Sequence, residues 1–88
     1  MDARLVEWAE PAFFRFIKIA TNQDRADVRE EIDRVEAGQE DAETHVLFSY
    51  PQKSYLVVVG KWRIILEDRN TIWLLTHIDN KMASGRAA

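Results

Sequence analysis

Three short apolar runs, rich in β-branched and aromatic residues, follow one another in the stretch Tyr55–His77, which reads YLVVVGKWRIILEDRNTIWLLTH. Short polar or glycine-containing segments separate them. Such runs are typical of strands, and three in succession joined by tight turns predict an antiparallel meander. This sheet constrains the fold more than any other feature, because its apolar side must be covered by another layer.

The first turn of the meander predicts which residues share a face of the sheet. Gly60-Lys61 suits a two-residue type II′ loop, because glycine accepts the positive φ of the first central position. Val59 then faces Trp62, and alternation places six residues on one entirely apolar face. They are Tyr55, Val57, Val59, Trp62, Ile64 and Leu66. The opposite face carries Leu56, Val58, Arg63, Ile65 and Glu67. We expect the first face to be buried.

The second turn, Asp68-Arg69-Asn70, leaves the register of the last strand open. A three-residue loop with Asn70 in the left-handed region places three residues of the last strand on the Arg63 face. These are Trp73, Leu75 and His77. A loop of two or four residues places the same three on the apolar face, because side chains alternate along a strand.

The first half of the chain predicts one short strand and two helices. Arg4–Trp8 alternates loosely as a strand does, and Pro11 suits the first turn of a helix. The second helix has Asn22 or Asp24 as its N-cap and Gly38 as its C-terminal cap. Its apolar stripe is narrow, which indicates a surface helix packed along one edge. The stripe consists of Val28, Ile32 and Val35.

The order of these elements predicts an α+β fold, βααβββ, with two helices packed on one face of a small antiparallel sheet. Val46–Phe48 is interpreted as either a further strand or a buried loop. We expect one domain over residues 1–82 and a disordered tail over residues 83–88. The sheet face with Arg63 should stay open to solvent or to a partner.

Composition narrows the functional classes. The 88 residues include no cysteine, which excludes disulfides and thiolate metal sites. The two histidines and scattered acids form no metal-ligand set, and nothing implies a cofactor. No apolar run approaches the roughly 20 residues of a membrane helix, and the N-terminus lacks a signal-peptide pattern. We therefore expect a cytoplasmic protein without a membrane partner.

Charge is unevenly distributed along the chain. Residues 24–43 hold three cations and nine anions, whereas residues 44–88 hold six cations and three anions. The acidic stretch is interpreted as the solvated face of a helix. The excess of three positive charges in the sheet half is far below that of dedicated nucleic-acid binders.

The block Tyr55–Ile65 has the form Tyr-x-apolar-x-Val-Gly-x-aromatic-Arg-apolar-apolar, and Leu5–Trp8 is an apolar run that ends in an aromatic before a helix. With the element order and length, these motifs resemble the RelE/ParE toxins of bacterial type II toxin–antitoxin systems. The resemblance covers about residues 4–80. It implies the βααβββ fold and a cognate antitoxin as partner.

The resemblance also implies two kinds of activity. In ribosome-dependent ribonuclease members, the open sheet face binds mRNA, and Arg63 and His77 match the arginine and histidine of that face. However, Ile78 and Asp79 follow His77 where many members have an arginine and further basic residues. A tyrosine that follows in those members is also missing, since Tyr55 is the last tyrosine of the chain. Members that poison DNA gyrase act by binding protein and need no such set.

We therefore predict a toxin-like protein that binds a cellular target, either DNA gyrase or the translation machinery, and is neutralised by a cognate antitoxin. The alternatives are a ribosome-dependent mRNA endoribonuclease and a non-toxic protein with only an interaction role. A homodimer is compatible with each of them. The candidate catalytic residues are Arg63 and His77. The candidate binding residues are Lys53, Lys61, Trp62 and Trp73.

Four of these side chains also have a structural interpretation. Arg63 could support the fold by pairing with Glu67 or a backbone carbonyl. His77 could pack half-buried at a strand end, and Trp62 and Trp73 could lie in the core.

Overall fold

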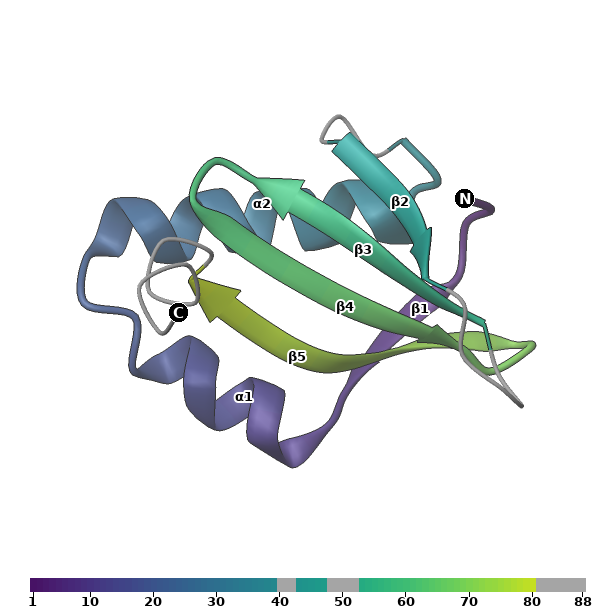
Figure 1. The fold of residues 1–88 in the computed structure, drawn as a ribbon, viewed down its shortest axis with the longest axis horizontal. Helices are drawn as coiled ribbons and strands as arrows, with labels where there is room; N and C mark the ends of the chain where they lie inside the picture. Colours follow the sequence, from purple (N-terminus) through teal and green to yellow (C-terminus); the bar gives the residue numbers. More distant parts are fainter. Residues whose placement is uncertain (40–42, 48–52, 81–88) are drawn as a thin grey trace.

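The computed structural model describes residues 1–39, 43–47 and 53–80. Its elements are β1 (Leu5–Trp8), α1 (Glu10–Ile17), α2 (Asn22–Glu36), β2 (Glu43–Leu47), β3 (Ser54–Val59), β4 (Trp62–Asp68) and β5 (Ile72–Asn80) (Figure 1). The strands form one sheet in the order β1-β5-β4-β3-β2. The expected tail at residues 83–88 lies outside the described residues, as does Phe48.

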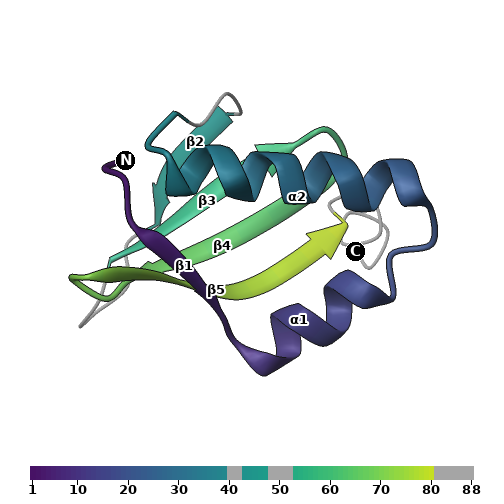
Figure 2. The same ribbon diagram turned by 180° about the vertical axis from the view of Figure 1, so that it is seen from behind.

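The two helices lie on the same face of the sheet, which confirms the predicted α+β arrangement. Figure 2 shows α1 and α2 in front of the sheet, and Figure 1 shows the opposite face of the strands without a helix over it. We call this second face the open face. Of the two alternatives for the segment that includes Val46, the strand is observed, because β2 pairs antiparallel with β3.

The sheet is mixed, whereas an antiparallel sheet was expected. β1 pairs parallel with β5, with Leu5 beside Ile72 and Trp8 beside Leu75. The chain leaves β1 through α1 and returns to β5 only after both helices and three strands, so nothing local sets the direction of this pairing. The carboxylate of Glu36 in α2 accepts a hydrogen bond from the Val6 backbone N–H at 2.9 Å.

The β3–β4 hairpin has the predicted register. Val59 pairs with Trp62, Val57 with Ile64 and Tyr55 with Leu66. Gly60 has a φ of +57, and the first central position of a type II′ turn requires a positive φ. Lys61, at the second central position, does not have a positive φ, because Asn70 is the one non-glycine residue with positive φ in the described part of the chain.

The core lies between the apolar sheet face and the helices. The predicted stripe of α2 is buried there, together with residues of β1, α1, β3, β4 and β5. The N-cap of α2 differs from both predicted candidates. The helix begins at Asn22, and the hydroxyl of Thr21, one residue earlier, accepts the Asp24 backbone N–H at 3.1 Å. Gly38 ends the helix with φ +70, as predicted.

A β-bulge in β5 sets the register of the last strand. Leu66 pairs with Leu75, but the next residue of β4, Ile65, pairs with His77, so Thr76 is the extra residue. Trp73 and Leu75 consequently point into the core, whereas His77 lies on the open face with Ile65. The structure thus separates three residues that each alternative for the second turn kept together.

Deletion of Thr76 is expected to preserve the fold, because Thr76 and His77 share one place opposite Ile65. The loss should be about 1 kcal/mol, from the hydrogen bond that Thr76 Oγ1 donates to the Ile65 carbonyl at 3.3 Å. Deletion of Leu74 is the matched control. It moves Thr76 into the core place of Leu75 and should cost about 2–5 kcal/mol. Urea unfolding measures both, and equal losses would contradict the bulge.

Side-chain contacts hold the N-terminal segment against the β4–β5 turn. The Arg4 guanidinium donates to Asp68 Oδ1 at 2.7 Å and lies 4.0 Å from the centroid of the Trp73 ring. Trp73 Nε1 donates to the Asp2 carbonyl at 3.0 Å. Two hydrogen bonds lower the pKa of Asp68 below its ordinary value of 3.8. The bond from the Asn70 backbone N–H has the larger effect, and the bond from the Arg4 side chain has the next largest.

This arrangement predicts a defined loss of stability in acid. The folded carboxyl of Asp68 binds its proton more weakly than the unfolded one, so its stabilisation is present above the ordinary pKa of 3.8. It is lost as the pH falls from that value through the lower folded pKa. In Asp68→Asn we expect lower stability at neutral pH and a shallower decline between about pH 5 and pH 2. Urea unfolding across this range measures it, and parallel curves for both proteins would disprove it.

Candidate functional site

A groove of about 260 Å³ lies on the open face. We call it the open-face groove. Four adjacent strands, β2 to β5, contribute to its lining. Its residues are Leu47, Leu56, Arg63, Ile65, His77 and Asp79. Leucine and isoleucine side chains form an apolar floor, and the three remaining side chains place one cation, one carboxylate and one imidazole beside it.

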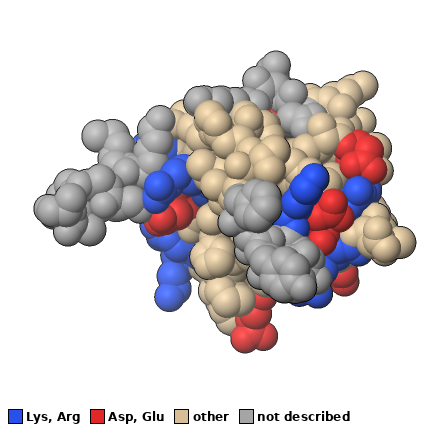
Figure 3. All heavy atoms as spheres, turned by 45° about the vertical axis from the view of Figure 1, so that its right-hand side comes forward, with Lys and Arg blue, Asp and Glu red and all other residues tan. Residues whose placement is uncertain are grey.

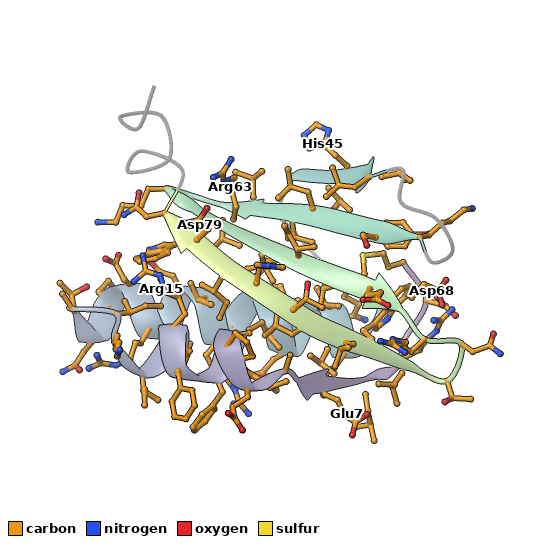
Figure 4. All side chains as sticks on the ribbon, turned by 60° about the horizontal axis from the view of Figure 1, so that its bottom comes forward. Glu7, Arg15, His45, Arg63, Asp68 and Asp79 are labelled. Atoms are coloured by element: carbon orange, nitrogen blue, oxygen red, sulfur yellow. The ribbon has the colours of Figure 1, made fainter. Side chains whose placement is uncertain are left out.

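Arg63 and Asp79 form an ion pair across β4 and β5. The two residues are direct partners in the antiparallel register, and Arg63 Nη2 lies 2.8 Å from Asp79 Oδ2. Figure 4 shows both side chains at the same end of the sheet, with Asp68 at the other end. The arginine is 33% exposed and the aspartate 49%. The guanidinium is therefore reachable from solvent, with a carboxylate in contact with it.

The carboxylate that pairs with Arg63 was not among the expected partners. Glu67, which shares the face, lies four residues along β4, or about 13 Å at the usual rise of a strand. It pairs instead with Arg69, with Nε at 3.0 Å from Oε1. Asp79 is nearer, because antiparallel pairing places it directly opposite Arg63.

His77 enters the open-face groove because of the bulge at Thr76. Its side chain is exposed, and its Nδ1 lies 3.0 Å from the Thr76 hydroxyl. It stands opposite Ile65 in β4, whereas Asp79 stands opposite Arg63, two residues away. Arg63 and His77, the two candidate catalytic residues, thus share one groove.

The two candidate binding lysines lie outside the open-face groove. Lys61, in the hairpin turn, is paired with Asp24 of α2, with Nζ at 3.2 Å from Oδ2, and this contact lowers the pKa of Asp24. Lys53 precedes β3 and lies beside the far end of β4, where its carbonyl accepts the Asp68 backbone N–H at 2.8 Å. Neither of them lines the groove that contains Arg63.

Both candidate tryptophans lie in the core on the helix side of the sheet. Trp62 is 6% exposed and Trp73 is 1% exposed. The Arg15 guanidinium of α1 lies 5.6 Å from the centroid of the Trp62 ring, and the Tyr55 ring meets that of Trp73 edge-on at 5.4 Å. Their rings therefore have packing partners within the fold and do not line the open-face groove.

Asp79 is a charged residue of the open-face groove that was not among the candidate site residues. Its signal was available in principle, because an aspartate two residues after His77 returns to the same face of a strand. The bulge that sets this face is not visible in the pattern. The sequence also does not indicate Leu47 as a groove residue, because its pattern is compatible with both a strand and a loop. Leu56 and Ile65 were placed on the correct face but not assigned a role.

The arrangement is suited to binding an apolar group beside a polar anchor. In Figure 3, acidic and basic side chains of the described residues lie next to one another instead of forming an extended basic surface in that view.

Within residues 1–39, 43–47 and 53–80, no group of three or more His, Asp and Glu side chains could hold a metal ion. None of the described helices is long and apolar enough to span a membrane.

Comparisons with known proteins identify the fold. No family model matches the sequence, and no curated protein matches it. The structure is similar to the crystal structure of the archaeal RelE–RelB complex from Pyrococcus horikoshii OT3, with a TM-score of 0.72 and 14% sequence identity. The match covers 92% of this chain and 97% of that chain. The chain therefore has a RelE-like fold.

Proposed function

We propose that this chain is the toxin-like component of a type II toxin–antitoxin module, acts in the cytoplasm by binding a target through the open-face groove, and is neutralised by a cognate antitoxin. The RelE-like fold supports the class, because the similar archaeal protein was crystallised as a RelE–RelB complex. The ion pair between Arg63 and Asp79 is the observation that favours binding over cleavage.

This ion pair is poorly suited to phosphate chemistry. An arginine that stabilises a phosphoryl transition state directs its N–H groups at the developing charge. Here Asp79 accepts a hydrogen bond from Arg63 at 2.8 Å and places a negative charge in the same groove. That charge repels a phosphate but is compatible with a protein partner, whose polar groups can satisfy a charged pair at the rim.

The floor of the groove supports the same conclusion. Leu56 and Ile65 are half-buried on a face that neither α1 nor α2 covers. Protein interfaces typically have an apolar centre within a polar rim, and a side chain that fills a small pocket often dominates the binding energy. The target of such a groove would be a protein of the DNA gyrase or translation machinery.

Inducible expression of the chain alone in bacteria tests this function. We expect growth arrest, relieved by co-expression of a cognate antitoxin. Ile65→Lys, on the groove floor, should abolish the arrest. The matched control is Leu74→Lys, which makes the same kind of change on the open face but outside the groove. It should retain the arrest. Purified protein in gyrase supercoiling and cell-free translation reactions then assigns the target.

Two results would count against the proposal. Normal growth on expression of the folded chain alone would exclude a toxic role. If Ile65→Lys and Leu74→Lys arrest growth equally, the groove floor is not the binding surface. Thermal unfolding of both variants separates loss of binding from loss of the fold.

An mRNA endoribonuclease is the second candidate, and one observation favours it. The bulge at Thr76 places His77 in the same groove as Arg63, which is the pairing of proton-transfer group and cation that such cleavage uses. Primer extension on mRNA with ribosomes present tests it. Cleavage should be lost in Arg63→Ala and increased in Asp79→Asn, which removes the opposing charge. No cleavage, or cleavage unaffected by Arg63→Ala, would exclude this activity.

A further inference from the structure

Helix α1 presents an apolar surface that neither the fold nor the open-face groove uses. Phe13, Phe14 and Ile17 are 48%, 49% and 51% exposed, although the helix has only eight residues. The opposite side of the same helix is packed, with Ala12 buried and Phe16 resting against the core. We call the three exposed residues the α1 patch.

The α1 patch lies apart from the open-face groove. α1 is in the helix layer, at the edge of the molecule beside β1 and β5 (Figure 2). The edge of the Phe13 ring meets the rings of Trp8 and Phe14, at centroid distances of 6.4 and 6.1 Å. Aromatic contacts with Trp8 and within the patch thus position Phe13, while the three patch residues remain about half exposed.

The charges at the two ends of α1 suggest what covers this patch. Glu10 begins the helix, Phe14 follows four residues later, and Lys18 follows after four more, at the C-cap. Residues four apart lie on one side of a helix, so these three form a row with an acid first, an aromatic in the middle and a base last. Over eight residues the two charges are about 12 Å apart along the axis.

A second copy of α1, running antiparallel, complements this row. With the two-fold axis at Phe14, the Phe14 rings of both copies meet, and Glu10 lies opposite the partner's Lys18 at both ends. Phe13 then lies on the same flank as the partner's Ile17. Such an isologous contact requires a surface that is complementary to itself, and the order of charges in α1 meets this requirement.

We propose that the chain forms a two-fold symmetric homodimer through antiparallel contact of the α1 patches. Three half-exposed side chains per copy make a small contact, so we expect a weak dimer with a dissociation constant on the order of micromolar. The open-face groove stays exposed in this dimer. The proposal is independent of the toxin-like function, because it rests only on α1.

Analytical ultracentrifugation of the full chain over about 1–200 μM, a range that spans micromolar dissociation constants, tests the dimer. Phe14→Asp should leave a monomer throughout the range. Glu10→Lys and Lys18→Glu should each weaken association at least about tenfold, because each places like charges opposite one another. The double variant restores opposite charges and should return to within about threefold of the parent. Val46→Asp is the matched control, since Val46 is 62% exposed on β2, and it should dimerise like the parent.

Any one of the following outcomes would overturn the proposal. The parent protein could be monomeric at every concentration, or the double charge reversal could fail to restore association. If the parent is monomeric and Phe14→Asp instead weakens binding of a co-expressed antitoxin, the α1 patch belongs to the antitoxin. Equal dissociation by Val46→Asp would place the contact elsewhere. Circular dichroism and thermal unfolding establish that every variant is folded.

Discussion

Trp73→Ala is expected to lower the free energy of unfolding by about 3–5 kcal/mol, the cost of removing a large aromatic side chain from a packed core. Trp73 is 1% exposed, and its indole N–H donates to the Asp2 carbonyl of the N-terminal segment. Its ring contacts Tyr55 edge-on and the Arg4 guanidinium through its face. A domain of 88 residues has only roughly 4–13 kcal/mol of stability in total. This single change should therefore remove a large part of that stability.

Chemical denaturation measures this effect, with two comparisons that separate its causes. Trp73→Phe keeps much of the apolar contact but loses the hydrogen bond to the Asp2 carbonyl, so it should cost about 1–2 kcal/mol. Leu5→Ala, at a β1 residue that is 72% exposed, should change stability by less than about 0.5 kcal/mol. A loss below about 1 kcal/mol for Trp73→Ala would mean that this tryptophan is not packed as described.

Gly38→Ala is expected to cost about 2–4 kcal/mol, from two separate causes. Gly38 ends α2 with φ +70, a left-handed conformation that an L side chain disfavours. An added Cβ would also lie 3.1 Å from the Ala3 backbone nitrogen and 3.4 Å from the Met1 carbonyl oxygen. The N-terminal segment would have to move, and its movement would disturb the hydrogen bond from Trp73 to Asp2.

Gly60→Ala provides the matched control for the second cause. Gly60 has a similar φ of +57, but an added Cβ there meets no atom within 4 Å. Its cost should be the conformational part alone, about 1–2 kcal/mol. The difference between the two variants, measured by urea unfolding, isolates the contact with the N-terminal segment. Equal losses would show that this segment yields without cost.

Local pattern predicted the three strands of the meander but not the register of the last one. The β3–β4 hairpin followed from one glycine and the alternation of apolar residues, because a two-residue loop leaves a single register. The second turn is compatible with more than one register of the last strand. Asn70 is left-handed, with φ +73, yet four residues separate Asp68 from its partner Trp73. The bulge at Thr76 then returns His77 to the open face, and no pattern in the sequence indicates a bulge there.

For the candidate site residues, the sequence likewise predicted positions within the hairpin but not contacts with distant residues. The position of Arg63 on the open face followed from the hairpin alone. The positions of Lys61 and Trp62 also follow from the hairpin, but their neighbours do not. Lys61 meets Asp24 and Trp62 meets Arg15, and both partners belong to helices far away in the sequence. These contacts decide whether a side chain is available to a ligand.

The sequence by itself determined the two faces of the β3–β4 hairpin, the helices and the open position of Arg63, because each depends on spacing between near neighbours. Only the tertiary structure decided that Asp79 pairs with Arg63, that His77 joins their groove and that β1 runs parallel to β5. These features depend on strand pairings and on a bulge whose register is set by core packing. The balance of charge in the open-face groove therefore comes from that packing.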